Sequence, residues 1–251
     1  MAVEWEVDGT TARGPSWAEL VDKAVSILGI EDPELLRVRG TDLQILEYLK
    51  IREASLFKLI HWLNANMKPS DDALRLSVIH QSLVKLAKCE CFYTTNYDNF
   101  IERAFQLAGR EVTSIASEHD LSLRRSRTRI VKFHGDFNRP ETMVLSESDY
   151  EKRMRLESLL DLMLRADVLG RAILFIGYSF KDPNVAYLFR LVNDHFQELP
   201  LSFVGRRAYI IVHQPSDFEM QLFNARRIQV IPTTGTERAV SVADVINEMA
   251  R

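Results

Sequence analysis

The sequence predicts an α/β protein in which a mostly parallel sheet is flanked by helices. Three strand-like apolar runs support this class, and polar or glycine-rich residues follow each run before a helical pattern begins. The runs lie at 91–92, 129–133 and 172–176. Hydrophobic residues make up 46% of the 251 residues, which is enough for a substantial core. We therefore expect a single domain over residues 1–251, with a helical insertion at about 31–88.

The N-terminal segment predicts a short strand followed by a helix. Val3, Trp5 and Val7 alternate with glutamates, a pattern typical of a half-exposed edge strand. Ser16 and Glu19 have the spacing of a capping box, which marks the start of a helix. The apolar stripe of this helix is expected to pack on the sheet, and it consists of Trp17, Leu20, Val21, Ala24, Val25 and Leu28.

The following segment predicts only helices. Residues 31–88 lack strand-like alternation, and helix-period stretches lie at 42–50, 55–67 and 71–88. Apolar side chains such as Leu59 are expected to belong to the core, and an interface with a partner protein is the alternative.

Asn96 and Asp98 follow the first apolar run, immediately before a predicted helix at 99–107. Ligands of open parallel sheets bind beyond the carboxyl ends of the strands, so polar side chains at this position point to a binding crevice. Capping of the helix, with Asp98 as the N-cap, is the alternative reading, because short polar residues at helix starts are common for structural reasons alone.

A histidine and a glycine, His134 and Gly135, end the predicted strand at 129–133. A histidine there titrates near neutrality and can accept a proton from a hydroxyl or water, while glycine permits a close backbone approach. This combination indicates an active site. The other five histidines lie in helical stretches or outside any motif, and we assign them no role.

The third apolar run, at 172–176, is typical of a strand buried on both faces and ends at Gly177. A backbone N–H group at Gly177 and the hydroxyl of Ser179 suit a ribose or phosphate. Asn184 or Asp182 can cap a helix predicted at 185–196. Other predicted elements are helices at 156–166 and 241–250 and strands at 207–212 and 229–231.

Three motifs in this order, at 94–98, 132–135 and 177–184, resemble those of the sirtuin-like (silent-information-regulator-like) NAD-consuming proteins of bacterial anti-phage defence. The match extends from about Gly14 to the C-terminus. It implies a Rossmann-like fold that binds NAD+ as a substrate. The resemblance implies three catalytic residues, Asn96, His134 and Asp98. It also implies that NAD+ contacts Thr95, Tyr97, Gly177, Tyr178, Ser179 and Asn184.

The chemistry of this family breaks the bond between nicotinamide and ribose through an oxocarbenium-like cation. The protein must position a nucleophile and stabilise the developing positive charge. By the resemblance, Asn96 contacts the nicotinamide ribose or the attacking water, and His134 is the general base at the same ribose. The side-chain oxygens of Asn96 and Asp98 are suited to face the cation.

The chain departs from the family at its start, where a glycine-rich turn usually holds the dinucleotide phosphates. The segment from Gly9 to Gly14 occupies this place, and its hydroxyls and the Arg13 guanidinium suit a phosphate. A disordered N-terminus or a mis-assigned start is the alternative.

The two cysteines, Cys89 and Cys91, are too few for the four-cysteine zinc ribbon of deacetylating sirtuins, and we expect them to be reduced core residues and no metal to be bound. The segment at 141–150 resembles that of the defence branch instead, where a short strand and a serine, aspartate and tyrosine follow the histidine. These features favour NAD+ hydrolysis over protein deacylation.

We therefore expect an NAD+ glycohydrolase (NADase) that releases nicotinamide and ADP-ribose and depletes NAD+ in abortive infection. The resemblance implies activation within an oligomer or hetero-complex, by a protein partner that is encoded nearby and senses infection. A non-catalytic sensor that binds NAD or ADP-ribose is the alternative, and an NAD-dependent protein deacylase is a further one.

Charge and hydropathy limit the other function classes. The absence of a bilayer-length apolar stretch and of signal-peptide features predicts a cytoplasmic protein without a membrane partner. A net charge of −3 and a pI near 6.1 argue against direct nucleic-acid binding. A local basic cluster is expected to be a solvated edge, with docking of an acidic partner or phosphates as the alternative. It consists of Arg124, Arg125, Arg127, Arg129 and Lys132.

Overall fold

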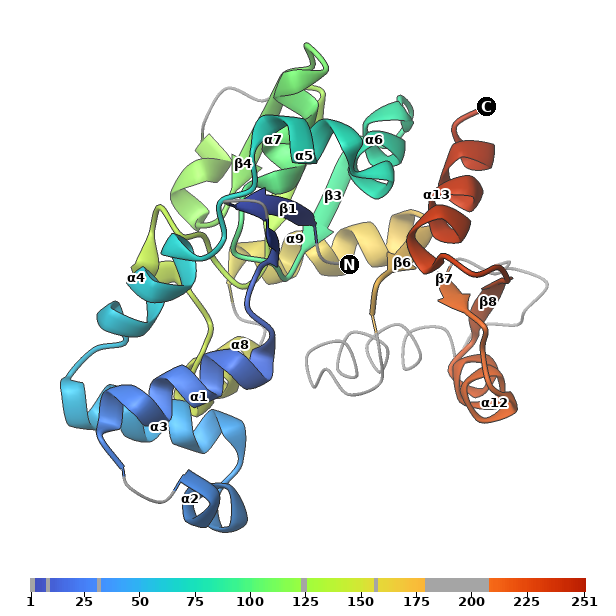
Figure 1. The fold of residues 1–251 in the computed structure, drawn as a ribbon. Coiled ribbons are helices and arrows are strands. Elements are labelled where there is room, and N and C mark those ends of the chain that lie inside the picture. Colours follow the sequence, from blue (N-terminus) through green and yellow to red (C-terminus); the bar gives the residue numbers. More distant parts are fainter. Residues whose placement is uncertain (1–2, 8–9, 31–32, 123–125, 156–157, 179–207) are drawn as a thin grey trace. The chain divides into compact units, whose positions relative to one another are not determined.

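The computed structural model describes residues 3–7, 10–30, 33–122, 126–155, 158–178 and 208–251 (Figure 1). The chain divides into two compact units, residues 2–155 and residues 156–251 together with Met1. Each unit contains a three-stranded parallel sheet and helices, which confirms the predicted α/β class.

The described part of the first unit contains five strands, eight α-helices and two short 3-10 helices. Its strands are β1 (Glu4–Val7), β2 (Thr10–Arg13), β3 (Cys91–Thr94), β4 (Val112–Ile115) and β5 (Thr128–Lys132). Its α-helices are α1 (Trp17–Leu28), α2 (Pro33–Arg39), α3 (Asp42–Glu53), α4 (Phe57–Ala65), α5 (Asp71–Leu76), α6 (Val78–Lys85), α7 (Phe100–Leu107) and α8 (Glu147–Met154). Two short 3-10 helices lie at Glu118–Ser122 and Pro140–Thr142.

The parallel sheet of this unit has the strand order β3-β5-β4. Thr94 at the end of β3 pairs with Lys132 at the end of β5, and Ile115 at the end of β4 pairs with Val131. The carboxyl ends of the three strands therefore lie at one edge of the sheet. The central strand β5 is the most buried, since Ile130 and Val131 have no exposed surface.

The N-terminal strand pairs with β2 in a separate antiparallel hairpin. Val3 and Trp5 are buried against Leu74 of α5 and Phe100 of α7, which fixes this hairpin to the helices. The predicted short strand is present, with Glu4 and Glu6 exposed, but it pairs in this hairpin and is not an edge strand of the parallel sheet. Residues 10–13, where the sequence suggested a phosphate-binding turn, form β2 instead, and the Arg13 guanidinium pairs with Glu19 at 3.1 Å.

The first long helix has the predicted capping box but a different packing partner. The Ser16 N–H donates to Glu19 Oε2 at 2.7 Å, and the Glu19 N–H donates to Ser16 Oγ at 3.3 Å. Leu20 and Ala24 of α1 pack in a cluster with residues of α3 and α4, not on the sheet as predicted. Trp17 is 38% exposed and is not part of this apolar face.

Residues 33–85, within the segment expected to be a helical insertion, form helices α2 to α6; in Figure 1, α2, α3 and α4 lie near α1, whereas α5 and α6 lie beside α7. The predicted helix at 71–88 divides at Ser77, which separates α5 from α6. Leu59 is fully buried, as expected for a core residue. Its core cluster also contains Met143 and Leu145 from the segment after β5.

The segment between β5 and α8 differs from the short strand expected there. Pro140–Thr142 form a 3-10 helix, and no strand is assigned in the described residues 143–146. Val144 nevertheless donates its N–H to the carbonyl oxygen of His134 at 2.9 Å. One backbone bond therefore holds this segment beside the histidine.

The second unit contains the helices α9 (Leu159–Gly170), α12 (Asp217–Ala225) and α13 (Arg238–Met249). Its sheet has the order β6 (Ile173–Ile176), β7 (Ala208–His213) and β8 (Ile228–Thr233), all parallel. The predicted strands and the C-terminal helix are confirmed. The helix predicted at 185–196 lies outside the described residues. In the part of the chain that the structure describes, no helix is long and apolar enough to cross a membrane.

Candidate functional site

The loops that follow β3 and β5 lie side by side at the carboxyl edge of the first sheet. The Phe133 N–H donates to the Thr94 carbonyl oxygen at 2.8 Å, which extends the strand pairing by one step. The Phe137 N–H donates to the Tyr97 carbonyl oxygen at 3.3 Å, which joins the loops again further out. The motifs around Asn96 and His134 are therefore brought together, as their positions after parallel strands predict.

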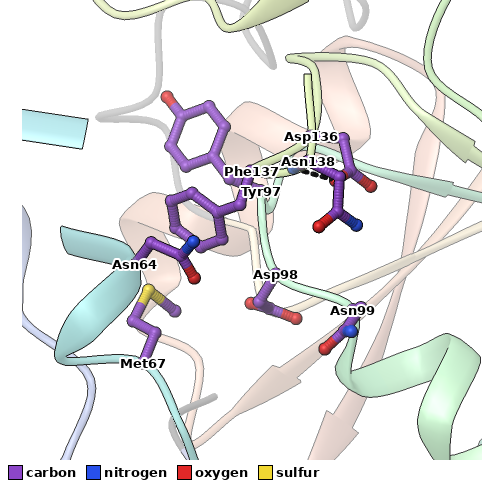
Figure 2. Close-up of a pocket in the computed structure, with 8 residues that line it drawn as sticks. All are labelled: Asn64, Met67, Tyr97, Asp98, Asn99, Asp136, Phe137 and Asn138. Atoms are coloured by element: carbon purple, nitrogen blue, oxygen red, sulfur yellow. Dashed lines mark hydrogen bonds between the residues drawn. The ribbon is translucent and has the colours of Figure 1, made fainter. Parts of the chain in front are cut away.

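A small pocket lies between these two loops and the end of α4 (Figure 2). Its lining residues are Asn64, Met67, Tyr97, Asp98, Asn99, Asp136, Phe137 and Asn138. Two of these eight side chains are carboxylates, and none of the eight is basic. The lining offers no basic side chain to a phosphate, and the charge of Asp136 is offset by the buried Lys132 ammonium at 2.6 Å.

Asp98 lines the pocket and lies one residue before Asn99, which is the N-cap of α7 in place of the predicted Asp98. The Asp98 Oδ1 accepts a hydrogen bond from the Phe100 N–H at 3.0 Å, at the first turn of α7. Burial raises the pKa of the Asp98 carboxyl to about 6, against the opposing effects of the Phe100 N–H and the positive charge of Lys132. Near neutral pH the carboxyl is mostly ionised, and a small change in its surroundings alters its charge.

The other residues of the first motif have different environments. Asn96 is exposed, and its N–H donates to Thr94 Oγ1 at 3.1 Å, which shapes the loop directly after β3. Thr95 is half-buried. The Tyr97 hydroxyl donates to the Val144 carbonyl oxygen at 2.7 Å, so this ring connects the loop to the segment after His134. Asn96 does not line the small pocket of Figure 2.

His134 lies beneath the loop surface and does not line the pocket either. The residue is 3% exposed, and its ring lies 5.9 Å from that of Phe133 and 5.7 Å from that of Tyr150, between ring centroids. Burial, and secondarily the nearby charge of Arg153, lower the pKa of His134 to about 3. Within the described residues, its Nε2 is buried without a hydrogen-bond partner. The imidazole is therefore neutral at pH 7, but it does not titrate near neutrality as expected from the sequence, and burial makes it a weak base in this structure.

The third motif belongs to the second unit. Gly177 directly follows β6 and has a φ of +77°, a conformation that favours glycine. The Tyr178 ring packs edge-on against Phe175, with the ring centroids 5.9 Å apart. Ser179 and Asn184 lie outside the described residues.

Lys132 was placed wrongly in the sequence interpretation, as part of a solvated basic edge. It is fully buried at the end of β5, whereas the Arg127 side chain is 76% exposed. Arg124 and Arg125 lie outside the described residues. A signal was present, because Lys132 and Ile130 are two apart and share a face of a buried strand. The neighbouring arginines instead favoured the interpretation that Lys132 belongs to a continuous basic surface.

The described residues contain no group of three or more histidine, cysteine or acidic side chains arranged to hold a metal ion. Cys89 and Cys91 are half-buried and are not joined in a disulfide. The Cys89 thiol donates to the carbonyl oxygen of Cys91 at 3.4 Å, a local bond at the start of β3.

A second buried histidine, His80 in α6, predicts a loss of stability in acid. Its Nδ1 lies 2.7 Å from Ser77 Oγ, and burial lowers its pKa to about 4. Between pH 6.5 and 4 the unfolded chain binds a proton here that the folded protein excludes, so the free energy of unfolding decreases as the pH falls. In urea titrations across this range, we expect wild type to lose about 1.4 kcal/mol per pH unit relative to His80→Gln. Parallel curves for the two proteins would contradict this assignment.

An α/β chain with a polar pocket at the carboxyl ends of parallel strands belongs to the broad class of ligand-binding α/β proteins. The model of the SIR2-like domain matches residues 90–231, which is more than half of the chain. The chain belongs to the SIR2-like domain family, and the family resemblance read from the three motifs is confirmed.

Curated relatives narrow the comparison further. The NAD(+) hydrolase ThsA of Acinetobacter baumannii is 31% identical over 121 residues, 47% of this chain and 25% of that protein. ThsA of Enterococcus faecium is 28% identical over 183 residues, 71% of this chain and 36% of that protein. Defense-associated sirtuin 2 of Bacillus subtilis is 33% identical over 102 residues, 39% of this chain and 10% of that protein. The chain thus matches well under half the length of each relative.

Proposed function

We propose that this protein is an NAD+ hydrolase that cleaves NAD+ to nicotinamide and ADP-ribose in anti-phage defence. One structural observation carries the proposal: the Asn96 and His134 loops lie side by side at the carboxyl edge of the sheet, around a pocket with two carboxylates. The names of the relatives, NAD(+) hydrolase and defense-associated sirtuin, support the same activity.

The chemistry assigns a separate task to each catalytic group. Cleavage leaves positive charge on the ribose, and the Asp98 carboxylate supplies negative charge that stabilises this cation. The exposed Asn96 amide, next to the pocket, orients the ribose or the attacking water. The neutral imidazole of His134 accepts the proton. Thr95, Tyr97, Gly177, Tyr178, Ser179 and Asn184 complete the proposed contacts with NAD+.

The proposal includes activation within a complex, by a protein that is encoded nearby and senses infection. The relatives are much longer than the matched region, so their further segments have no counterpart in the alignment. We propose that the active form is an oligomer or hetero-complex in the cytoplasm.

The test measures nicotinamide and ADP-ribose release from NAD+ by chromatography, with and without the proteins of neighbouring genes. We expect Asn96→Ala and His134→Ala each to lower the rate by about 100-fold or more, the range for loss of a positioned acid–base group. Asn224→Ala and His119→Ala are matched controls at exposed positions outside the site, and we expect them to retain the wild-type rate.

The alternatives predict different outcomes of the same assay. A non-catalytic sensor would bind NAD+ without releasing nicotinamide under any condition. A deacylase would release nicotinamide only when an acyl-lysine peptide is added. Full activity of the isolated chain would refute activation by a partner and leave the hydrolase assignment intact.

A further inference from the structure

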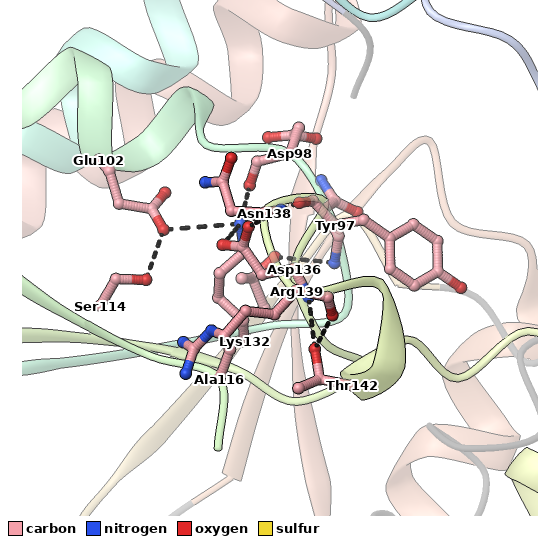
Figure 3. A network of polar contacts seen from close by, with 12 residues as sticks. Tyr97, Asp98, Glu102, Ser114, Ala116, Lys132, Asp136, Asn138, Arg139 and Thr142 are labelled. Carbon is pink, nitrogen blue, oxygen red and sulfur yellow. Dashed lines mark hydrogen bonds and ion pairs between the residues drawn. The ribbon is translucent and has the colours of Figure 1, made fainter. Parts of the chain in front are cut away.

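Lys132 is a buried cation whose hydrogen-bonding capacity is fully used (Figure 3). Its ammonium donates to the carbonyl oxygens of Tyr97 at 2.9 Å and Asp98 at 2.5 Å, and it pairs with Asp136 Oδ2 at 2.6 Å. An ammonium has three N–H donors, so these three contacts use all of them. A fourth group, Glu102 Oε1, lies further away at 3.7 Å.

Stability alone does not account for this arrangement. Lys132 is 0% exposed and the Asp136 side chain 9% exposed, so both charges have been removed from water. A buried ion pair is generally no more stabilising than well-packed apolar residues of the same volume, because desolvation offsets the attraction. We therefore consider which parts of the candidate site the three contacts of Lys132 hold in place.

The three bonds join the two loops of the candidate site. Two of the acceptors are consecutive backbone carbonyls, directly after Asn96 in the first loop. The third acceptor, Asp136, lies two residues after His134 in the second loop and also accepts from the Asn138 N–H at 2.7 Å. The ammonium therefore fixes the path of both loops at the pocket, from a position on the rigid central strand β5.

We propose that Lys132 is a positioning residue that sets the geometry of the Asn96 and His134 loops for NAD+ cleavage. This inference rests on the proposed function, but its structural part can be tested without any activity. Lys132 does not line the pocket, so it acts through the two loops and not on the substrate.

The test compares Lys132→Met/Asp136→Asn with Asp136→Asn alone. The double variant removes the ammonium and its charged partner together, which avoids leaving a buried charge unpaired. The single variant removes the pocket carboxylate but keeps both bonds from Lys132 to the first loop. In the single variant the Lys132 ammonium keeps only Glu102 Oε1, at 3.7 Å, as a charged partner, so the cost of the unpaired charge falls on the single variant. Faster exchange in the double variant than in the single variant therefore reports the bonds to Tyr97 and Asp98.

A matched control is available on α7. Arg103 also donates to a backbone carbonyl, that of Pro69 at 3.0 Å, and also pairs with an aspartate, Asp71 at 2.5 Å. We expect Arg103→Met/Asp71→Asn to keep the wild-type kcat and loop protection. A general effect of losing a cation and its aspartate would appear in both double variants.

Two readouts are combined, hydrogen–deuterium exchange of the peptide covering 94–100 and the kinetics of nicotinamide release. The Asn96 and Phe100 N–H groups are hydrogen-bonded in this loop, so their exchange reports its opening. We expect the double variant to exchange faster than Asp136→Asn in this peptide, with the peptides of the second unit unchanged. We also expect kcat to be about 100-fold lower than in Asp136→Asn while KM changes little, as for a displaced catalytic group.

The outcomes separate this inference from the proposed function. Equal exchange of 94–100 in the two variants overturns the positioning role, whatever the activity. Faster exchange with an unchanged kcat overturns it as well, because the loop order would then not matter for the reaction. If wild type releases no nicotinamide with any partner, the proposed function fails, and the exchange comparison still decides whether Lys132 orders the loop.

Discussion

Replacing Gly135 with alanine is expected to destabilise the first unit by more than about 3 kcal/mol, a loss in the severe range for single substitutions. Gly135 has a φ of +92°, and a Cβ there would lie 2.3 Å from the carbonyl oxygen of Thr142 and 2.7 Å from the Met143 Cα. These are backbone atoms that cannot rotate away. The Val144 N–H bond to the His134 carbonyl further restrains this segment.

Gly109→Ala provides the control for this prediction. Gly109 also has a positive φ, +71°, but a Cβ there would meet no atom within 4 Å. Backbone strain alone should therefore cost about 1–2 kcal/mol at this position. Urea unfolding of both variants separates the cost of backbone strain from the cost of the steric clash. Similar losses of unfolding free energy in the two variants would show that Thr142 does not approach Gly135 closely in solution.

Asp98→Asn is expected to make the protein more stable above pH 6 and much less active. Burial raises the pKa of this carboxyl from 3.8 to about 6, so ionisation is unfavourable in the folded protein. The folded state binds a proton more tightly than the unfolded state between these values, and stability is lost as the pH rises through this window. At pH 8 the ionised form costs about 3 kcal/mol, the equivalent of a shift of about two pKa units.

Asparagine removes this charge but keeps the other contacts of the residue. Its side-chain oxygen can still accept the Phe100 N–H, and Lys132 binds only the backbone carbonyl of residue 98. We expect the unfolding free energy of the variant to exceed that of wild type at pH 8 and to approach it near pH 4. Nicotinamide release should fall by about 100-fold or more, since the charge facing the ribosyl cation is lost.

Asp72→Asn, at an exposed site in the first turn of α5, is the control for removal of a carboxylate. It should change neither the rate nor the pH dependence of unfolding to a comparable extent. An Asp98→Asn protein that is less stable than wild type at both pH values would show that the carboxylate stabilises the fold and is not held there for function.

The sequence predicted those elements whose causes are local. Helix α7 was predicted because its apolar residues recur at helical spacing, although its N-cap is Asn99 and not Asp98. The capping box of Ser16 and Glu19 located the start of α1. The three motifs were recognised as neighbours in space because they follow parallel strands, and two of them are now placed side by side.

The errors concern long-range packing, which a residue pattern does not record. The stripe of α1 is amphipathic whether it faces a sheet or other helices, so its partner could not be read from spacing. Strand β4 was missed because Val112–Ile115 contains only two apolar residues. The burial of Lys132 depends on acceptors 35 and 34 residues away in sequence, Tyr97 and Asp98.

One core cluster joins the helical insertion to the segment that follows His134. Met143 and Leu145 are embedded among the side chains of α1, α3 and α4, while Val144 between them is bonded to His134. Displacement of those helices would move Met143 and Leu145, and with them the Val144 N–H that is bonded to the His134 backbone carbonyl. The shared core therefore ties the position of the His134 loop to the packing of these helices.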